Sequence, residues 1–314
     1  MSSTPRIVVL MATHNGGAYI EEQLNSVLNQ AGVDLQVIVS DDNSSDETTN
    51  IVRARAALDS RISMLPAGHF GSAGKNFYRL ILDADVTSFH AVAFCDQDDI
   101  WEPWKLRRHF DLLMHPDGID GLGPYAAISS NVAAVNTSGR RQLIVKNQLQ
   151  RENDYVFESG GPGSTFLLRL ETFAFIREQL DSPQSPAQAV TAHDWCMYAL
   201  VRASGRRWFI DGEPSVLYRQ HSNNVLGANE GLRQHVARLR QIANGSHRRD
   251  VERVLAACIP VAHGRTLVQL EWLQQIVVRR NVIDRIRLAR QSYRLRRRRR
   301  DQLALAAVVV AGIW

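Results

Sequence analysis

Continuous apolar runs that alternate with amphipathic segments constrain the fold of this chain more than any other feature of its sequence. Residues 7–12 are such a run, residues 35–40 are a second strand-like run, and apolar side chains recur at helical spacing in residues 18–30, with a further helix predicted at residues 48–58. A strand without polar alternation is buried on both faces, as in a parallel sheet, and short loops between such segments give β-α-β units. The sequence therefore predicts an α/β fold with a mostly parallel central sheet flanked by helices.

Polar residues follow these strand-like runs at the point where each run ends. Thr13 and Asp42 follow the first two runs, and the sequence Asp-Gln-Asp-Asp at residues 96–99 follows a third apolar run at residues 90–95. Ligands of open parallel sheets bind at the carboxyl ends of the strands. We therefore expect these polar residues to gather at one edge of the sheet and to form a binding site there.

Three carboxylates in residues 96–99 directly follow a run that we expect to be buried. Carboxylates this close repel one another, and their removal from water costs several kcal/mol. A hard divalent cation offsets this cost, and Mg²⁺ or Mn²⁺ combines one or two carboxylates with phosphate oxygens. The motif indicates a metal site, and a solvated acidic turn is the alternative.

Length and composition limit the other possibilities. With 314 residues, the chain is predicted to form one large domain at residues 1–230 and a helical C-terminal region at residues 231–314. The three cysteines are far apart and lack metal-ligand spacing, which is typical of a protein in a reducing compartment. We expect no signal peptide and no membrane-spanning segment.

Basic residues gather near the C-terminal end, where arginines occupy every position from 296 to 300. An apolar segment ending in Trp314 follows at residues 303–314. Arginines beside such a segment favour an interfacial anchor on an anionic membrane. One alternative is a helix docked on the core or on another subunit, and the second case would make a homodimer. The other alternative is an arm that binds nucleic acid. No aromatic platform or known motif supports nucleic acid.

Six segments together resemble the family 2 glycosyltransferases, which are inverting enzymes with the GT-A fold. These segments are residues 8–15, 39–46, 75–77, 96–99, 193–195 and 218–224, and the resemblance covers roughly residues 6–227. It implies a Rossmann-like GT-A domain with a C-terminal helical appendage. The combination is most similar to the bacterial rhamnosyltransferase branch, which uses dTDP-L-rhamnose.

The resemblance also implies how the acidic motif works. Asp98 would be a direct ligand of Mg²⁺ or Mn²⁺, Asp96 would lie nearer the ribose or the metal, and Asp99 would support them or cap a helix. His221 would contact the metal or the diphosphate, with a surface loop as its alternative, and Arg219 is a candidate for phosphate.

The general base is expected to be Asp194, at the head of an amphipathic segment. A helix N-terminus favours an ionised carboxylate, so the alternative role of Asp194 is a helix cap. Its neighbours His193 and Trp195 are candidates for contact with the acceptor or for support of the base.

The donor nucleotide is expected to contact residues near the first strands. Asp42 can accept a hydrogen bond from N3–H of uracil or thymine, and Thr13 would close on the same ring. The other candidates for nucleotide-sugar binding are Asn15, Lys75, Asn76, Asp96 and Gln97. This set favours a UDP- or dTDP-sugar without separating the two.

Rival functions lack features that they require. A metal-dependent nucleotidyltransferase needs a basic triphosphate loop near the N-terminus, but residues 13–17 contain neither lysine nor arginine. A processive synthase needs transmembrane helices. The sequence therefore favours a single-addition transferase, and the resemblance implies that it transfers L-rhamnose to a hydroxyl of a cell-envelope glycan or lipid-linked acceptor, on the cytoplasmic face of the membrane. A UDP-sugar-dependent transferase is the alternative.

Overall fold

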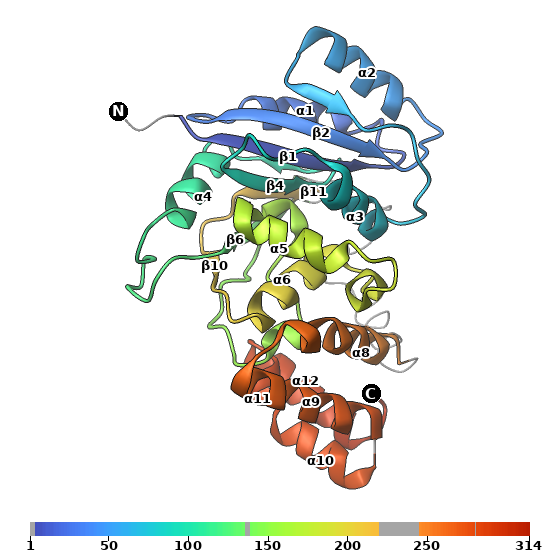
Figure 1. The fold of residues 1–314 in the computed structure, drawn as a ribbon, viewed down its shortest axis with the longest axis vertical. Helices are drawn as coiled ribbons and strands as arrows, with labels where there is room; N and C mark the ends of the chain where they lie inside the picture. Colours follow the sequence, from blue (N-terminus) through green and yellow to red (C-terminus); the bar gives the residue numbers. More distant parts are fainter. Residues whose placement is uncertain (1–3, 136–138, 220–244, 280) are drawn as a thin grey trace. The chain divides into compact units, whose positions relative to one another are not determined.

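The computed structural model describes residues 4–135, 139–219, 245–279 and 281–314 (Figure 1). It divides into two compact units. The first, called the sheet unit here, consists of Met1–Lys146, Gly161–Pro183 and Arg207–Asn224. The second, called the helical unit, consists of Asn147–Gly160, Gln184–Arg206 and Val225–Trp314.

The sheet unit contains two sheets. Its strands are β1 (Arg6–Thr13), β2 (Asp34–Asp41), β3 (Ile62–Met64), β4 (Ala91–Cys95), β5 (Ile100–Trp101), β6 (Ala127–Ser130), β7 (Val132–Val135), β8 (Arg141–Ile144), β9 (Leu167–Arg169), β10 (Trp208–Asp211) and β11 (Val216–Arg219). Within the described ranges, the larger sheet has the order β10-β6-β9-β4-β1-β2-β3, and the smaller one β5-β11-β7-β8. In the larger sheet only β9 is antiparallel to its neighbours, so the predicted mostly parallel sheet is confirmed.

Helices cover both faces of the larger sheet (Figure 1). They are α1 (Ile20–Leu28), α2 (Thr48–Leu58), α3 (Ala73–Asp83), α4 (Lys105–Leu113) and α5 (Leu170–Leu180). Successive strand side chains point to opposite faces. On β1, Ile7, Val9 and Met11 belong to the cluster that includes α1, α2 and α4. On the other face, Phe94 of β4 contacts Phe77 of α3 and Phe173 of α5.

The helical unit is built from short and medium helices. They are η1 (Asp154–Val156), η3 (Pro186–Ala189), α6 (His193–Ala203), α8 (Ser246–Cys258), η4 (Ile259–Val261), α9 (Gly264–Arg279), α10 (Val282–Arg290), α11 (Ser292–Leu295) and α12 (Arg299–Val310). The predicted helical C-terminal region is therefore present. This unit also takes up residues 147–160 and 184–206, which lie before the expected boundary at residue 230. That boundary lies outside the described residues and stays a prediction.

Part of the C-terminal tail is buried within the helical unit. Helix α12 packs against α10 and α11. Leu305 and Val309 are buried, and the buried Trp314 ring stacks on Phe157 at a centroid distance of 5.8 Å. Arg297 is also buried, 3.6 Å from Asp154. The docked-helix alternative thus holds for these residues, which have no surface to offer to lipid. No helix in the described ranges is long and apolar enough to cross a membrane.

Candidate active site

The carboxyl ends of β1, β2 and β4 bring the predicted polar residues to one edge of the larger sheet. The strands are parallel and in register, so that Thr13 lies beside Asp41 and Met11 beside Cys95. Residues 96–99 therefore begin next to the end of β1. This arrangement agrees with the gathering expected from the sequence.

Asn76 ties β1 and β2 together at this edge. Its buried side-chain amide donates to the carbonyl oxygens of Thr13 at 3.2 Å and Ser40 at 2.9 Å, and it accepts from the Ser40 hydroxyl at 2.5 Å. These bonds occupy both amide protons. Asn76 thus supports the site from beneath, and its direct contact with a donor stays a prediction. The neighbouring Lys75 is exposed in the first turn of α3.

The end of β2 contains two buried aspartates with different roles. Asp41 accepts from the Thr13 hydroxyl at 2.8 Å and from the Ser44 backbone N–H at 2.8 Å, which fixes the turn after the strand. The sequence analysis did not single out Asp41, although it directly precedes Asp42.

The Asp42 carboxylate binds the loop at residues 69–71. It accepts from the backbone N–H of Phe70 and from that of Gly71, the latter at 2.9 Å, and lies 3.4 Å from the His69 ring. A carboxylate has about four lone-pair sites, so a pyrimidine N3–H can share it with the loop. The contact with the base stays a prediction.

Gln97 clamps the turn after β1. Its side-chain oxygen accepts from the His14 backbone N–H at 2.8 Å, and its amide donates to the His14 carbonyl at 2.9 Å. A Cβ atom at Gly16 would lie 2.2 Å from the Gln97 side-chain oxygen, so this clamp requires glycine at residue 16. Asn15, whose φ is 48°, accepts from the Ser45 backbone N–H at 2.8 Å. Asn15 and Gln97 therefore shape the backbone that would face a nucleotide.

The carboxylates of the acidic motif differ in exposure. Asp96 and Asp98 are half-buried, whereas Asp99 is buried. The pKa of Asp99 is raised to about 7, chiefly by burial and then by the neighbouring charge of Asp98, while Ser164 and Arg219 act in the opposite direction. Within the described residues, neither carboxylate oxygen of Asp99 has a hydrogen-bond partner. A buried carboxylate without a partner beside a second carboxylate is a donor set suited to a hard cation.

Lys105 is a buried cation near this motif that the sequence analysis missed. Its ammonium lies 3.5 Å from the centre of the Trp101 ring, and burial lowers its pKa to about 7. The charge of Asp99 raises that pKa, which indicates that the two side chains attract each other. The sequence signal was weak, since Lys105 is an ordinary residue in the first turn of α4.

The remaining metal and phosphate candidates are His221 and Arg219, and the charge of Arg219 lowers the pKa of Asp99. His221 lies outside the described residues. Arg219, at the end of β11, forms an ion pair with Glu22 of α1 at 2.5 Å and lies over the Tyr19 ring. Within the described ranges, no three His, Cys, Asp or Glu side chains form a ready metal site.

The expected base and its neighbours begin helix α6 of the helical unit. Asp194 is half-buried, and its carboxylate accepts from the Trp195 backbone N–H at 2.7 Å. The N-cap of α6 is Ala192, so Asp194 is not the cap residue and instead lies in the first turn. Burial lowers the pKa of His193 to about 3, and the Trp195 indole donates to the Tyr155 carbonyl at 2.8 Å.

Comparison with known proteins identifies the family. Residues 8–175 match the family described as Glycosyl transferase family 2. The dTDP-rhamnosyl transferase RfbG of Shigella flexneri is 34% identical over 306 residues, which cover 97% of this chain and 100% of that protein. The chain belongs to glycosyl transferase family 2. It is therefore an enzyme of glycosyl transfer, as the sequence resemblance indicated.

Other relatives and solved structures agree with this assignment. The UDP-Glc:alpha-D-GlcNAc-diphosphoundecaprenol beta-1,3-glucosyltransferase WfgD of Escherichia coli is 29% identical over 46% of this chain and 54% of its own length. TarS 1-349 of S. aureus in complex with UDP-GlcNAc has a TM-score of 0.56 at 15% identity, covering 98% of this chain and 82% of that one. The mannosyltransferase PcManGT of Pyrobaculum calidifontis, in complex with GDP-Man and Mn²⁺, has a TM-score of 0.52 at 16% identity, covering 99% and 86%. These structures show that the family 2 chain has the GT-A fold.

Proposed function

We propose that this enzyme transfers one L-rhamnose from dTDP-L-rhamnose to a hydroxyl group of a cell-envelope glycan or lipid-linked acceptor. The observation that carries this proposal is the 34% identity, over 97% of the chain, with a protein named as a dTDP-rhamnosyl transferase. A lipid-linked acceptor is supported by the E. coli relative, whose name specifies a diphosphoundecaprenol acceptor.

The proposed reaction is a single displacement with inversion. The acceptor oxygen forms a bond to the anomeric carbon of the donor sugar, the bond from that carbon to the diphosphate oxygen breaks, and dTDP leaves. The acceptor hydroxyl gives its proton to the Asp194 carboxylate. Three features support Asp194 in this role: the family resemblance, its partial exposure, and its place in the first turn of α6, where a helix N-terminus favours the charged form of a carboxylate.

We assign the diphosphate end of the donor to the acidic motif together with a divalent cation, Mg²⁺ or Mn²⁺. Asp98 would hold this cation, with Asp96 and His221 as further ligands, and the bound cation would offset the charge of the leaving diphosphate. The support from this chain is the buried, partnerless carboxylate of Asp99 beside Asp98. In this proposal Asp99 and Lys105 lie behind the ligands and orient them.

Residues at the ends of β1 and β2 would hold the nucleoside. Asp42 and Thr13 are assigned to the pyrimidine ring, and the clamp between Gln97 and His14 fixes the backbone around it. Asn15 would complete this wall, while Lys75 and Arg219 are the candidates for phosphate. These assignments predict selectivity for uracil or thymine over cytosine, because cytosine lacks the N3–H group from which Asp42 would accept a hydrogen bond.

A UDP-sugar donor is the second candidate, favoured by the E. coli relative that uses UDP-Glc. A donor screen separates the two. The purified chain is incubated with dTDP-L-rhamnose, UDP-glucose, UDP-N-acetylglucosamine or GDP-mannose in the presence of Mg²⁺ or Mn²⁺, and release of nucleoside diphosphate is measured. We expect the highest rate with dTDP-L-rhamnose; a UDP-sugar preferred by tenfold or more would refute the rhamnose assignment.

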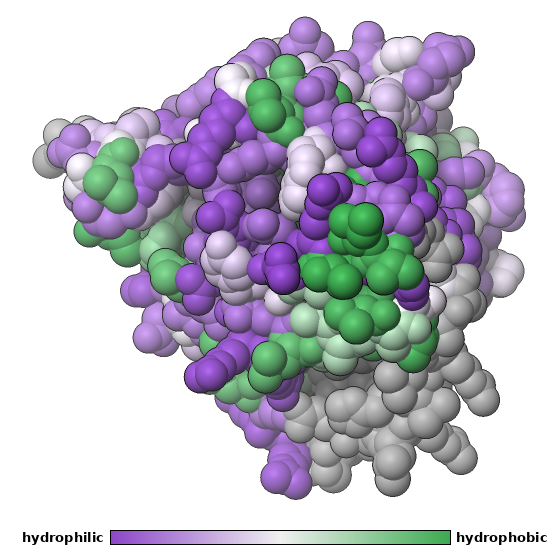
Figure 2. Space-filling view, turned by 90° about the horizontal axis from the view of Figure 1, so that it is seen from below, coloured by the Kyte–Doolittle hydropathy of each residue, from purple (hydrophilic) through white to green (hydrophobic). Residues whose placement is uncertain are grey.

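We also propose that the helical unit rests on an anionic membrane, where a lipid-linked acceptor would lie. Its candidate contact residues are the exposed apolar side chains Val282, Ile283, Ile286, Leu303, Val310 and Ile313. Figure 2, seen from the side where Figure 1 draws α10 and α12, shows apolar side chains gathered among hydrophilic ones. The exposed Arg299 and Arg300 supply charge complementary to anionic lipid.

A further inference from the structure

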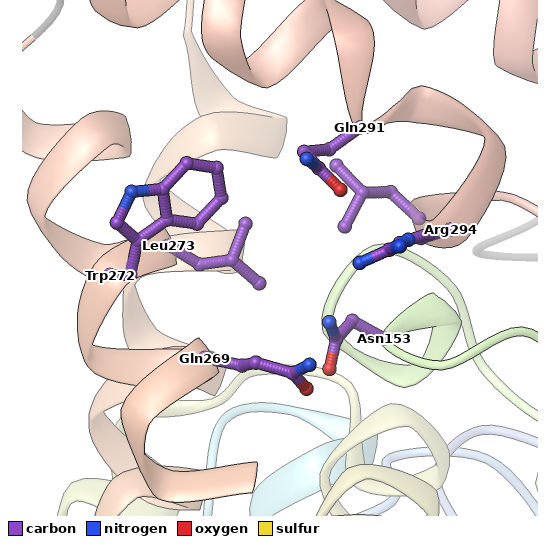
Figure 3. A pocket seen from close by; sticks show the side chains of 7 residues that line it. Asn153, Gln269, Trp272, Leu273, Gln291 and Arg294 are labelled. Carbon is purple, nitrogen blue, oxygen red and sulfur yellow. The ribbon is translucent and has the colours of Figure 1, made fainter. Parts of the chain in front are cut away.

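A small cavity in the helical unit has a lining of both polar and apolar side chains. It lies between α9, α11 with the residue before it, and the segment before η1, and its volume is about 180 Å³ (Figure 3). The residues around it are Asn153, Gln269, Trp272, Leu273, Gln291, Arg294 and Leu295. One aromatic ring, two leucines, three carboxamides and one guanidinium thus surround a space that opens to solvent.

The size of the cavity limits what it can hold. At roughly 30 Å³ for each water molecule, 180 Å³ corresponds to about six waters. Drug-sized ligands and nucleotides need about 300–1,000 Å³. The cavity therefore suits a single small ring, and it is too small to enclose a nucleotide or a disaccharide.

Several polar groups of the lining are free to bind a ligand. Within the described residues, the side-chain amide of Gln291, the NH₂ group of Asn153 and the indole N–H of Trp272 make no hydrogen bond. Figure 3 shows the Gln291, Arg294 and Asn153 side chains grouped on one side of the space and Trp272 with Leu273 on the other. One side of the cavity thus offers hydrogen bonds and the other offers an apolar surface.

Charge at the cavity favours a neutral ligand over an anion. The guanidinium of Arg294 lies 3.3 Å from the Glu152 carboxylate, which also lies 3.3 Å from Arg265 and accepts from the Gln269 amide at 2.6 Å. An anion would have to compete with Glu152 for Arg294. A neutral molecule with several hydroxyl groups can use the remaining N–H groups of Arg294 and the carboxamides without breaking this ion pair.

We infer that this cavity binds one neutral sugar ring of a glycan. A pyranose has an apolar C–H face, which fits the Trp272 ring and Leu273, and a rim of hydroxyl groups, which match the carboxamides and Arg294. The inference rests on the proposed glycan acceptor and adds to it a place on the helical unit that holds one of the acceptor's sugar units.

Binding without donor tests the inference separately from catalysis. The full chain is titrated with methyl α-L-rhamnopyranoside and with N-acetylglucosamine, and saturation transfer from protein to sugar is measured by NMR. Glucuronate serves as the anionic probe. The variants are Trp272→Ala and Gln291→Ala, with Val268→Ala on the same helix as the control, because Val268 is exposed and does not line the cavity.

We expect a neutral sugar to bind to the wild type and to V268A with the same affinity, and at least tenfold more weakly to W272A and Q291A. Equal binding by all four proteins, or no binding by any, would overturn the inference and leave a water-filled crevice. Stronger binding of glucuronate than of either neutral sugar would overturn the assignment of a neutral ligand. Thermal melts show whether W272A folds, and Q291A, which changes a half-buried side chain, gives an independent answer.

Kinetics with two acceptors then link the cavity to the proposed function. For an acceptor of several sugars, we expect W272A to raise KM about tenfold with kcat unchanged; for a monosaccharide acceptor, both constants should stay at wild-type values. Equal effects on both acceptors would contradict the inference. If no acceptor is glycosylated from dTDP-L-rhamnose, the proposed function fails, while the NMR titration still decides whether the cavity binds sugar.

Discussion

The buried guanidinium of Arg297 in the helical unit lies 3.6 Å from Asp154 and 3.3 Å from Glu158, whereas the buried Asp99 carboxylate in the sheet unit has no hydrogen-bond partner among the described residues. Both units bury charge. The buried Arg297 of the helical unit and the buried Asp211 of the sheet unit, which lies 2.6 Å from Arg108, are paired with opposite charge, whereas the Asp99 carboxylate accepts no hydrogen bond from the described residues. A buried charge is tolerated when it is paired or when a ligand completes it. The difference indicates that Arg297 serves stability and that the Asp99 region serves binding.

The pairing in the helical unit extends beyond one contact. Arg202 lies 3.2 Å from Asp154 and donates to the Tyr198 hydroxyl at 2.6 Å, while the Arg297 backbone N–H donates to Glu158 at 2.7 Å. This network joins η1, α6 and the segment before α12. In the sheet unit the charged groups that act on the pKa of Asp99 are the Asp98 carboxylate and the Arg219 guanidinium, and Asp99 in turn raises the pKa of the buried Lys105.

The largest effect is expected from removal of a charged ligand in the sheet unit. Asp98→Asn should lower turnover by about 10²–10³ or more, because the charge that would hold the cation is lost, while the melting temperature stays within 2 °C of wild type by rough estimate. Chelation of the wild type should abolish turnover, and added Mn²⁺ should restore it. Asp111→Asn, in an exposed helical ion pair, is the control. Full activity in excess chelator would remove the metal from the mechanism.

An effect of similar size on rate is expected from the helical unit. Asp194→Asn keeps the shape of the side chain but cannot accept a proton, so kcat should fall by about 10²–10⁴. The affinity for dTDP, measured by calorimetry, should not change. Asp250→Asn, in a solvent-accessible ion pair of α8, is the matched control. A variant that melts earlier yet keeps its turnover would assign Asp194 to helix stability alone.

Stability measurements sharpen the contrast between the two kinds of buried charge. Arg297→Met leaves Asp154 and Glu158 uncompensated and should cost about 3–5 kcal/mol of unfolding free energy. In metal-free protein, Asp99→Asn removes a buried carboxylate that accepts no hydrogen bond from the described residues, and it should leave stability unchanged or raise it. Arg299→Met, at an exposed position, is the control. Urea unfolding gives all three values, and destabilisation by Asp99→Asn as large as that by Arg297→Met would erase the distinction.

Much of the sheet unit could be predicted from the sequence, because its signals are local. The runs at residues 7–12, 35–40 and 90–95 became β1, β2 and β4, since a largely apolar run of this length has few alternatives to a buried parallel strand. The acidic motif was visible because its carboxylates are adjacent. The supporting roles of Asn76 and Asp41 were not visible, because they depend on which strand ends become neighbours.

The helical unit was harder to predict because its decisive contacts join residues far apart in sequence. Five consecutive arginines are normally exposed to solvent. No residue near Arg297 in the sequence indicates that Asp154 and Glu158 are its partners. The tail was therefore expected to contact lipid as a whole, whereas Arg297, Leu305, Val309 and Trp314 are buried. The sugar-sized cavity gave no sequence signal, because its lining comes from separate helices.

The pH dependence of stability should come partly from His193. Burial lowers the pKa of His193 in the folded chain to about 3, whereas an unfolded histidine titrates near 6.5. Between these values the unfolded chain binds the extra proton, so stability should fall as pH drops from about 6.5, by at most about 1.4 kcal/mol per pH unit. Urea midpoints at pH 7 and pH 5 measure this slope. His193→Gln should make it shallower, and an unchanged slope would contradict the buried neutral imidazole.

The smallest effect concerns lipid, and the buried part of the tail changes how it must be tested. Truncation after Ser292 would remove Arg297 and unfold the helical unit, so surface substitutions are required. Arg299→Gln with Arg300→Gln should reduce co-sedimentation with anionic vesicles at low salt, because each lost charge weakens the free energy of membrane binding by about 1 kcal/mol. Leu303→Asn with Ile313→Asn should weaken it through lost apolar burial, because both side chains are exposed. Arg53→Gln with Arg140→Gln, exposed in the sheet unit, is the matched control. If a basic protein were attracted to anionic lipid in general, both pairs of arginine substitutions would weaken co-sedimentation equally. That result would refute a specific membrane face on the helical unit.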